Sequence, residues 1–250
     1  IFLFSNYLWS HRQSIKVSEA IKAHSPHSVT IHGGPDTPGY LEDIKTYFAA
    51  NPHVDITVHG EGEVTTAEIL KALTGKVGNG PVDLSVLEDV KGLSYRWGDS
   101  IVHTGSRDRL ENLDVIPSPY LTGLFDSYGE VPEIAVTIET NRGCPYGCTF
   151  CDWGSNTMAR IRKFDLDRVF AELEWSAKVQ MNYVVIADAN FGIFERDVDI
   201  ARKVAELRSE HGAPVTVGTN YAKNTVKHLS KIIDIFAGAG IVAEGKVSLQ

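Results

Sequence analysis

The sequence predicts an α/β protein with two successive units, each built on a parallel sheet. Short apolar or β-branched runs alternate with helical patterns over residues 1–105, and the same alternation starts again at residue 133. The intervening residues, 106–132, are rich in proline and glycine. Strands that alternate with helices at this spacing indicate βαβ units. We therefore predict a first domain over 1–105, a linker over 106–132 and a second domain over 133–250.

In the first unit we expect three strand–helix pairs followed by a hairpin. The helical segments carry apolar residues at intervals of three and four, as one buried face requires. Gly98 and Asp99, between the last two strands, favour a tight turn. The expected strands are 1–5, 28–34, 54–60, 92–97 and 100–105, and the expected helices are 14–24, 40–50 and 63–73.

In the second unit we expect four strands that alternate with three helices. Asp165 is suited to cap the first helix, and Gly212 ends the second. The chain opens without a methionine inside one expected strand and closes inside another, so we expect a piece of a longer protein. The expected strands are 133–140, 183–188, 214–220 and 245–250, and the expected helices are 165–178, 196–212 and 225–240.

The composition argues against several classes of protein. The formal net charge of −8 comes from scattered acids, whereas a nucleic-acid surface needs clustered basic residues. No run approaches the roughly 20 apolar residues that span a bilayer. Three cysteines cannot all pair, and a secreted disulfide scaffold normally has an even number. We expect a cytoplasmic protein without a nucleic-acid partner or a membrane span.

All three cysteines lie in one short stretch, NRGCPYGCTFC, directly after the expected strand 133–140. Cys144, Cys148 and Cys151 follow the spacing C-x3-C-x2-C, and thiolates cluster in this way to hold a metal. Structural zinc and iron–sulfur clusters normally take four protein ligands, but there is no fourth cysteine and no histidine near the loop. The pattern favours a [4Fe–4S] cluster with one open iron over two alternatives, zinc with a distant ligand and reduced structural thiols.

The stretch RGCPYGCTFC, with Phe150 before the last cysteine, resembles the radical S-adenosylmethionine (SAM) superfamily. The resemblance implies a partial (β/α)6 TIM-like barrel, here incomplete with four strands, and a cluster loop after the first strand. It also implies that the open iron binds SAM and that one electron cleaves SAM to a 5′-deoxyadenosyl radical. An electron donor such as flavodoxin or ferredoxin would then be a partner.

The resemblance also suggests which residues contact SAM, since barrel enzymes work at the C-terminal ends of their strands. Asp188 and Asn190, in the segment after the second strand, would contact the amino end of SAM, although Asp188 could instead cap a helix. Phe150 would flank the adenine or simply pack in the loop. Asn220 and Gln250 would contact the ribose or the methionine part.

A glycine pair after the expected strand 28–34 and a GEGE turn after 54–60 resemble the cobalamin-binding domain that precedes many radical SAM cores. Rossmann-like, doubly wound sheets bind large cofactors outside the carboxyl ends of their strands. Glycines there let a corrin approach the backbone, but they also suit ordinary tight turns. The chain lacks the D-x-H-x-x-G motif with which some cobalamin proteins bind cobalt. The implied cobalamin-binding residues are Ser5, Gly33, Gly34, Gly60, Glu61 and Gly62.

The two signatures together predict a cobalamin-dependent radical SAM enzyme, most often a methyltransferase. It would methylate an unactivated carbon of a small-molecule or peptide substrate, with the [4Fe–4S] cluster, SAM and cobalamin as cofactors. One alternative is a cyclase or rearrangement enzyme that uses the same cofactors without methyl transfer. Another is a non-catalytic iron–sulfur or zinc-binding module. A methylthiotransferase would have further cysteines in its N-terminal domain, and there are none here.

Overall fold

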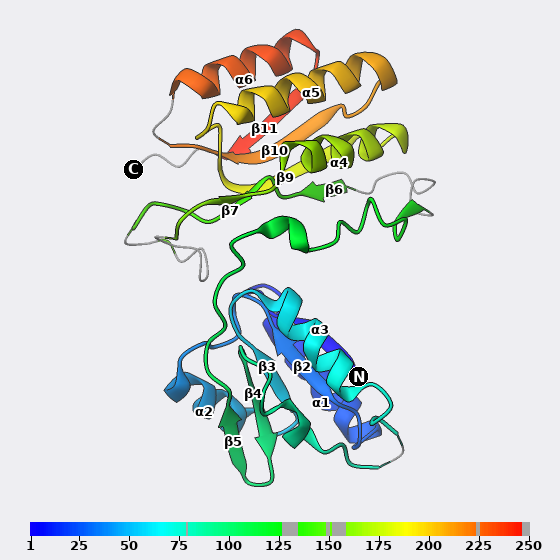
Figure 1. The fold of residues 1–250 in the computed structure, drawn as a ribbon, viewed down its shortest axis with the longest axis vertical. Coiled ribbons are helices and arrows are strands. Elements are labelled where there is room, and N and C mark those ends of the chain that lie inside the picture. Colours follow the sequence, from blue (N-terminus) through cyan, green and yellow to red (C-terminus); the bar gives the residue numbers. More distant parts are fainter. Residues whose placement is uncertain (79, 127–134, 149–150, 152–158, 224–225, 247–250) are drawn as a thin grey trace. The chain divides into compact units, whose positions relative to one another are not determined.

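The chain divides into two compact units, Ile1–Leu110 and Glu111–Gln250, each with its own main sheet (Figure 1). The structure is a computed structural model. It describes residues 1–78, 80–126, 135–148, 151, 159–223 and 226–246.

The first unit contains a five-stranded sheet with the order β1-β2-β3-β4-β5. The first three strands are parallel, and the last two continue the sheet as an antiparallel hairpin, as the sequence predicts. The strands are β1 (Phe2–Ser5), β2 (Thr30–Gly33), β3 (Ile56–Val58), β4 (Leu93–Trp97) and β5 (Ser100–His103). The helices are α1 (His11–His24), α2 (Leu41–Ala50) and α3 (Gly62–Leu73).

Helix α1 begins three residues before its predicted start, because its first turn is polar. Arg12 and Gln13 are exposed, so the apolar periodicity that marks the helix begins only at Ile15. A sequence pattern detects the buried face of a helix rather than its hydrogen-bonded ends.

The two faces of this sheet differ in chemistry. Helix α3 and the 3₁₀ helix η1 (Leu84–Leu87) cover an apolar face, with Ile31, Ile56 and Tyr95 side by side in the core. On the opposite face, towards α1 and α2, the paired positions are His32, Thr57, Ser94 and His103. Helices on both faces are what a Rossmann-like sheet requires.

The second unit contains a four-stranded parallel sheet with the order β11-β10-β9-β6. Figure 1 shows its three helices next to one another over one face of the sheet. The strands are β6 (Ala135–Ile138), β9 (Tyr183–Phe191), β10 (Thr216–Tyr221) and β11 (Val242–Lys246), and the helices are α4 (Leu166–Lys178), α5 (Arg196–His211) and α6 (Val226–Gly238). A separate short pair, β7 (Asn141–Arg142) and β8 (Arg162–Lys163), frames the cysteine loop.

Two predicted strand limits in this unit are wrong. The last strand was expected at 245–250 but is β11, and residues 247–250 lie outside the described residues. Glu244 and Gly245 interrupt the apolar pattern that would have marked this strand. Gly245 is needed because the Tyr221 ring would lie 1.9 Å from a Cβ atom there. Strand β9 was expected to end at Asp188 but continues to Phe191, since its polar residues are buried.

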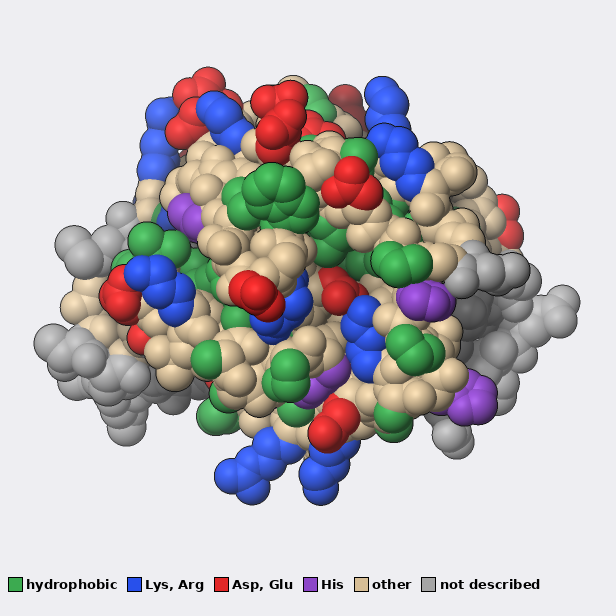
Figure 2. All heavy atoms as spheres, turned by 90° about the horizontal axis from the view of Figure 1, so that it is seen from below, with side chains coloured by type: hydrophobic (Ala, Val, Ile, Leu, Met, Phe, Trp, Pro, Cys, Tyr) green, Lys and Arg blue, Asp and Glu red, His purple; other side chains and the backbone are tan. Residues whose placement is uncertain are grey.

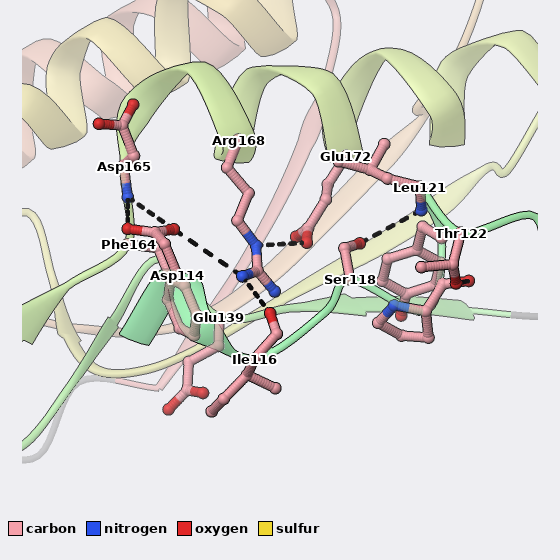
Figure 3. A network of polar contacts seen from close by, with 12 residues as sticks. Asp114, Ile116, Ser118, Leu121, Thr122, Glu139, Phe164, Asp165, Arg168 and Glu172 are labelled. Carbon is pink, nitrogen blue, oxygen red and sulfur yellow. Dashed lines mark hydrogen bonds and ion pairs between the residues drawn. The ribbon is translucent and has the colours of Figure 1, made fainter. Parts of the chain in front are cut away.

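The segment that follows the first unit packs onto the second. The 3₁₀ helix η2 (Leu113–Val115) leads into a turn at Ser118, whose hydroxyl accepts a hydrogen bond from the Leu121 backbone (3.3 Å). Arg168 of α4 donates to the carbonyl of Ile116, and its Nε lies 3.2 Å from Glu172 (Figure 3). These contacts fix residues 111–121 against the start of α4.

Charges of both signs are interspersed on the face drawn in Figure 2, where lysines and arginines lie among aspartates and glutamates rather than in one basic area. Among the helices that the structure describes, none is long and apolar enough to cross a membrane.

His32 is a fully buried histidine in the polar face of the first sheet. Its Nδ1 lies 3.2 Å from Asn6 Nδ2, its Nε2 lies 2.9 Å from Ser18 Oγ, and its ring stacks on Phe4. Because an amide nitrogen only donates, Nδ1 accepts and Nε2 carries the hydrogen. The ring is therefore neutral, and burial lowers the pKa of His32 to about 4.

We predict that His32 makes the protein acid-labile. Its pKa falls from 6.5 in the unfolded chain to about 4 in the fold, so between these values the unfolded state binds more protons and stability rises with pH. The contribution is about 3 kcal/mol, since one pKa unit corresponds to ~1.4 kcal/mol. Urea unfolding at pH 4 to 7 should show a shallower pH dependence for His32→Gln than for wild type. The same substitution at the exposed His27 should leave the slope unchanged, and equal slopes for all three proteins would contradict the prediction.

Candidate functional site

The cysteine loop leaves the carboxyl end of β6 through a turn that requires glycine. Gly143 has a φ of +122°, and a Cβ atom there would lie 2.8 Å from the carbonyl oxygen of Arg160. The loop thus passes directly against the segment that returns to α4. Glycine 143 is explained by this close approach of two backbone segments.

Cys144, Cys148 and Cys151 are half-buried and form no disulfide. The backbone N–H of Cys151 donates to the carbonyl of Cys148 at 3.1 Å, which closes a turn between the last two cysteines. Phe150, the predicted adenine neighbour, lies outside the described residues. Across the described ranges, no three His, Cys, Asp or Glu side chains converge closely enough to hold a metal ion.

The donor chemistry around two of the thiols nevertheless fits an iron–sulfur cluster. Asn190 Nδ2 lies 3.3 Å from Cys144 Sγ, and Lys223 Nζ lies 3.8 Å from Cys148 Sγ. Nitrogen donors aimed at cysteine sulfurs are a common feature of protein-bound clusters. Three soft thiol ligands, two of them with such a donor nearby, suit iron and sulfide better than a hard cation.

Asp188 anchors the start of the cysteine loop from within β9. Its side chain is fully buried, and Oδ1 accepts from the backbone N–H groups of Thr140 (2.8 Å) and Asn141 (3.1 Å). Oδ2 accepts from Asn141 Nδ2 (2.6 Å) and from the Thr140 hydroxyl. The carboxylate therefore holds both residues that precede Arg142.

Burial raises the pKa of Asp188 to about 7, and the hydrogen bonds from Thr140 and Asn141 act in the opposite direction. The Thr140 hydroxyl can reverse its role and accept when Asp188 is protonated, because a hydroxyl both donates and accepts. The anchor can thus persist in both protonation states.

The alternative role predicted for Asp188, helix capping, is wrong. Asp197 makes the contacts at the start of α5, where its Oδ2 accepts from the backbone N–H groups of Gly192 (2.9 Å) and Phe194 (3.0 Å). A direct contact between Asp188 and SAM finds no support either, since both of its oxygens are engaged and its surface is buried.

Of the other residues predicted to contact SAM, the structure describes Asn190 and Asn220. Asn190 is 2% exposed, and its Oδ1 has no hydrogen-bond partner among the described residues. Asn220 is half-buried near the carboxyl end of β10, opposite Lys246 of β11. Gln250 lies outside the described residues. The sequence analysis missed Lys223. Its position just after β10, whose carboxyl end lies at the same edge as that of β9, was the one feature that could have indicated a role.

In the first unit, the predicted glycines have different structural reasons. Gly34 has a φ of +98°, and a Cβ atom there would lie 2.7 Å from the Asn6 carbonyl oxygen, so packing between two loops requires it. Gly60 has a φ of +68°, and a Cβ atom there would meet no atom within 4 Å, so the space beside it is open. Gly33 meets only an ordinary contact with Val58 at 3.5 Å.

The remaining predicted cobalamin-binding residues also lie at the carboxyl ends of the parallel strands. Ser5 ends β1, and its carbonyl accepts from the Ser10 hydroxyl at 3.2 Å. Glu61 precedes α3 and accepts from the Leu110 backbone N–H at 3.3 Å, and Gly62 is the first residue of that helix.

Large exposed side chains lie in the loops at this edge. Leu8 and Trp9, in the loop after β1, are 84% and 75% exposed, and Tyr40, after β2, is 81% exposed. Tyr7 stacks on Trp9 with ring centroids 4.8 Å apart. Both loops follow neighbouring parallel strands, so these exposed apolar side chains belong to the same end of the sheet.

Comparison with known proteins gives consistent results. No family model matches the chain. Over its whole length the chain is 38% identical to the cobalamin-dependent radical SAM methyltransferase TokK of Streptomyces tokunonensis. It is 37% identical to the 2-(S-pantetheinyl)-carbapenam-3-carboxylate methyltransferase of Streptantibioticus cattleyicolor. The chain spans 36% of the length of each relative.

The fold resembles that of a solved structure. The radical S-adenosylmethionine methyltransferase TsrM from Kitasatospora setae matches with a TM-score of 0.61, over 98% of this chain and 55% of TsrM. The identity is 13%, so this match is evidence for a shared α/β fold.

We predict that Asp188→Asn destabilises the second unit by about 1–3 kcal/mol, because an amide nitrogen would face hydrogen-bond donors that then lose their acceptor. Urea unfolding at pH 7 measures the change. Asp199→Asn is the matched control, since Asp199 is a 48% exposed partner of Arg202 and its loss should cost at most about 0.5 kcal/mol. Equal stabilities of the two variants would refute the anchoring role of Asp188.

Proposed function

Over its whole length the chain is a homologue of cobalamin-dependent radical SAM methyltransferases, and from this premise we propose that the protein methylates an unactivated carbon of a small-molecule substrate. The observation that carries the proposal is the full-chain identity to TokK and to a carbapenam carboxylate methyltransferase. The C-x3-C-x2-C loop of this chain, at the carboxyl edge of a parallel sheet, supports it. Small molecules are the favoured substrate class because one relative is named for a carbapenam carboxylate.

In this proposal Cys144, Cys148 and Cys151 hold a [4Fe–4S] cluster. When bound, the cluster and SAM supply a 5′-deoxyadenosyl radical, and cobalamin supplies the methyl group. Asp188 fixes the entrance of the loop through Thr140 and Asn141, so that the thiols start from a defined position. Flavodoxin or ferredoxin is the proposed class of electron donor.

We assign the second unit to the first four strands of a partial (β/α)6 barrel. Its strands β6, β9, β10 and β11 are neighbours in their order along the chain, and the helices lie on one face. A doubly wound sheet reverses its strand order and carries helices on both faces, whereas a barrel does neither. In a barrel, Asn190 and Asn220 would lie at the end where SAM binds.

We assign cobalamin to the carboxyl edge of the sheet in the first unit, Ile1–Leu110. Gly60 leaves open space there, and Trp9 and Tyr40 offer broad apolar surfaces for a large flat ring. Packing against Asn6 already explains why residue 34 is a glycine, so Gly34 supports a cobalamin site less than Gly60 does.

Anaerobic reconstitution of the protein with iron and sulfide, followed by an assay, tests the proposal. With SAM, a low-potential reductant and hydroxocobalamin, every transferred methyl group must come from SAM. We expect 5′-deoxyadenosine by chromatography, and S-adenosylhomocysteine once substrate is present. Cys148→Ala should lose most of the iron and all 5′-deoxyadenosine, because the cluster would lack a ligand. Zinc in place of iron would favour a non-catalytic module, and 5′-deoxyadenosine with product but without S-adenosylhomocysteine would favour a cyclase.

We predict that Trp9→Ala weakens cobalamin binding about tenfold or more, since a buried aromatic face contributes ~1.5–3 kcal/mol. Hydroxocobalamin titration followed by its visible absorption measures the affinity. Trp97→Ala is the matched control, because Trp97 is 58% exposed at the opposite edge of the same sheet. Equal affinities of the two variants would place the corrin elsewhere.

A further inference from the structure

Two nitrogen donors from adjacent strands lie close to two different cysteines. Asn190, near the end of β9, approaches Cys144 Sγ at 3.3 Å, and Lys223, two residues after β10, approaches Cys148 Sγ at 3.8 Å. Neither donor belongs to the cysteine loop. Each contact spans a long stretch of sequence, so the fold rather than local geometry brings each pair together.

The backbone links the two donors to each other. The N–H of Ala222 donates to the carbonyl of Phe191 at 2.8 Å, and these two residues directly neighbour Lys223 and Asn190. Asp197 fixes the end of β9 from the other side by accepting from the Gly192 N–H. The fold therefore fixes the backbone positions of the two donors relative to each other.

The two donors differ in charge and burial. The Asn190 amide is 2% exposed and neutral, so its N–H is directed at Cys144 in a nearly dry environment. The Lys223 ammonium is half-buried and positive, so it acts on Cys148 mainly through its charge. Electrostatic effects are larger in such surroundings than in water.

We infer that Asn190 and Lys223 are positioning residues that raise the reduction potential of the cluster held by Cys144 and Cys148. One-electron reduction adds a negative charge that spreads onto the cysteine sulfurs. Donors and a cation beside those sulfurs stabilise the reduced state more than the oxidised state. This inference rests on the proposed function, because it requires that these cysteines hold an iron–sulfur cluster.

The consequence concerns the first electron transfer. A less negative potential allows a protein donor such as flavodoxin or ferredoxin to reduce the cluster. Asn190→Leu keeps the size of the side chain but removes the N–H, and Lys223→Met keeps its length but removes the charge. Each substitution should make the midpoint potential more negative, and the double variant should show the largest shift.

The test is a redox titration of the reconstituted protein without SAM, with the reduced cluster followed by electron paramagnetic resonance. Iron and sulfide are quantified for every sample. For the double variant we expect at least a tenfold loss in the equilibrium constant for reduction, which is a shift of ~59 mV in a one-electron couple. Lys223→Arg should restore the wild-type potential, because it restores the positive charge.

Lys227→Met is the matched control, because it removes the same charge from an exposed position on α6. Its potential should equal that of wild type. If the single and double variants keep full iron and sulfide and the wild-type potential, the inference is overturned and the proposed function stands. If wild-type protein itself takes up no iron and sulfide, the proposed function fails and the inference with it. Should Asn190→Leu not fold, the difference in midpoint potential between Lys223→Met and Lys227→Met is sufficient to test the inference.

Discussion

The cysteine loop depends on one buried carboxylate, that of Asp188. A charged or protonated carboxyl group without exposed surface is costly unless donors satisfy it, and here Thr140 and Asn141 supply four hydrogen bonds. The same bonds join the end of β6 to β9 at the point where the chain leaves the sheet. The loop that carries Cys144 therefore starts from a rigid position.

Glycine serves two different purposes in the two units. At Gly143 and Gly34 a side-chain carbon would collide with a neighbouring backbone, so these positions are explained by packing alone. Among the four glycines predicted to bind cobalamin, Gly60 alone has no atom within 4 Å of a Cβ position, so its positive φ comes with open space in which a ligand could reach the backbone. A glycine-rich motif thus contains both structural and binding positions, and they can be distinguished only from the surroundings of each glycine in the fold.

The sequence predicted the order and type of the helices and main strands because buried faces repeat with a period of two or about 3.6 residues. It failed where polar residues are buried. Asp188 and Asn190 suggested a loop because hydrophilic residues usually end a strand, yet their partners lie far away along the chain. Lys223 went unnoticed for the same reason, since nothing in its neighbourhood indicates a cysteine 75 residues earlier.

The order of the strands explains why these distant residues meet. Strands β6, β9 and β10 are parallel neighbours, so their carboxyl ends lie in a row at one edge. A loop that follows β6 and bends along this edge passes the end of β9 first and the end of β10 next. Cys144 accordingly lies beside Asn190 of β9, and Cys148 lies beside Lys223 after β10.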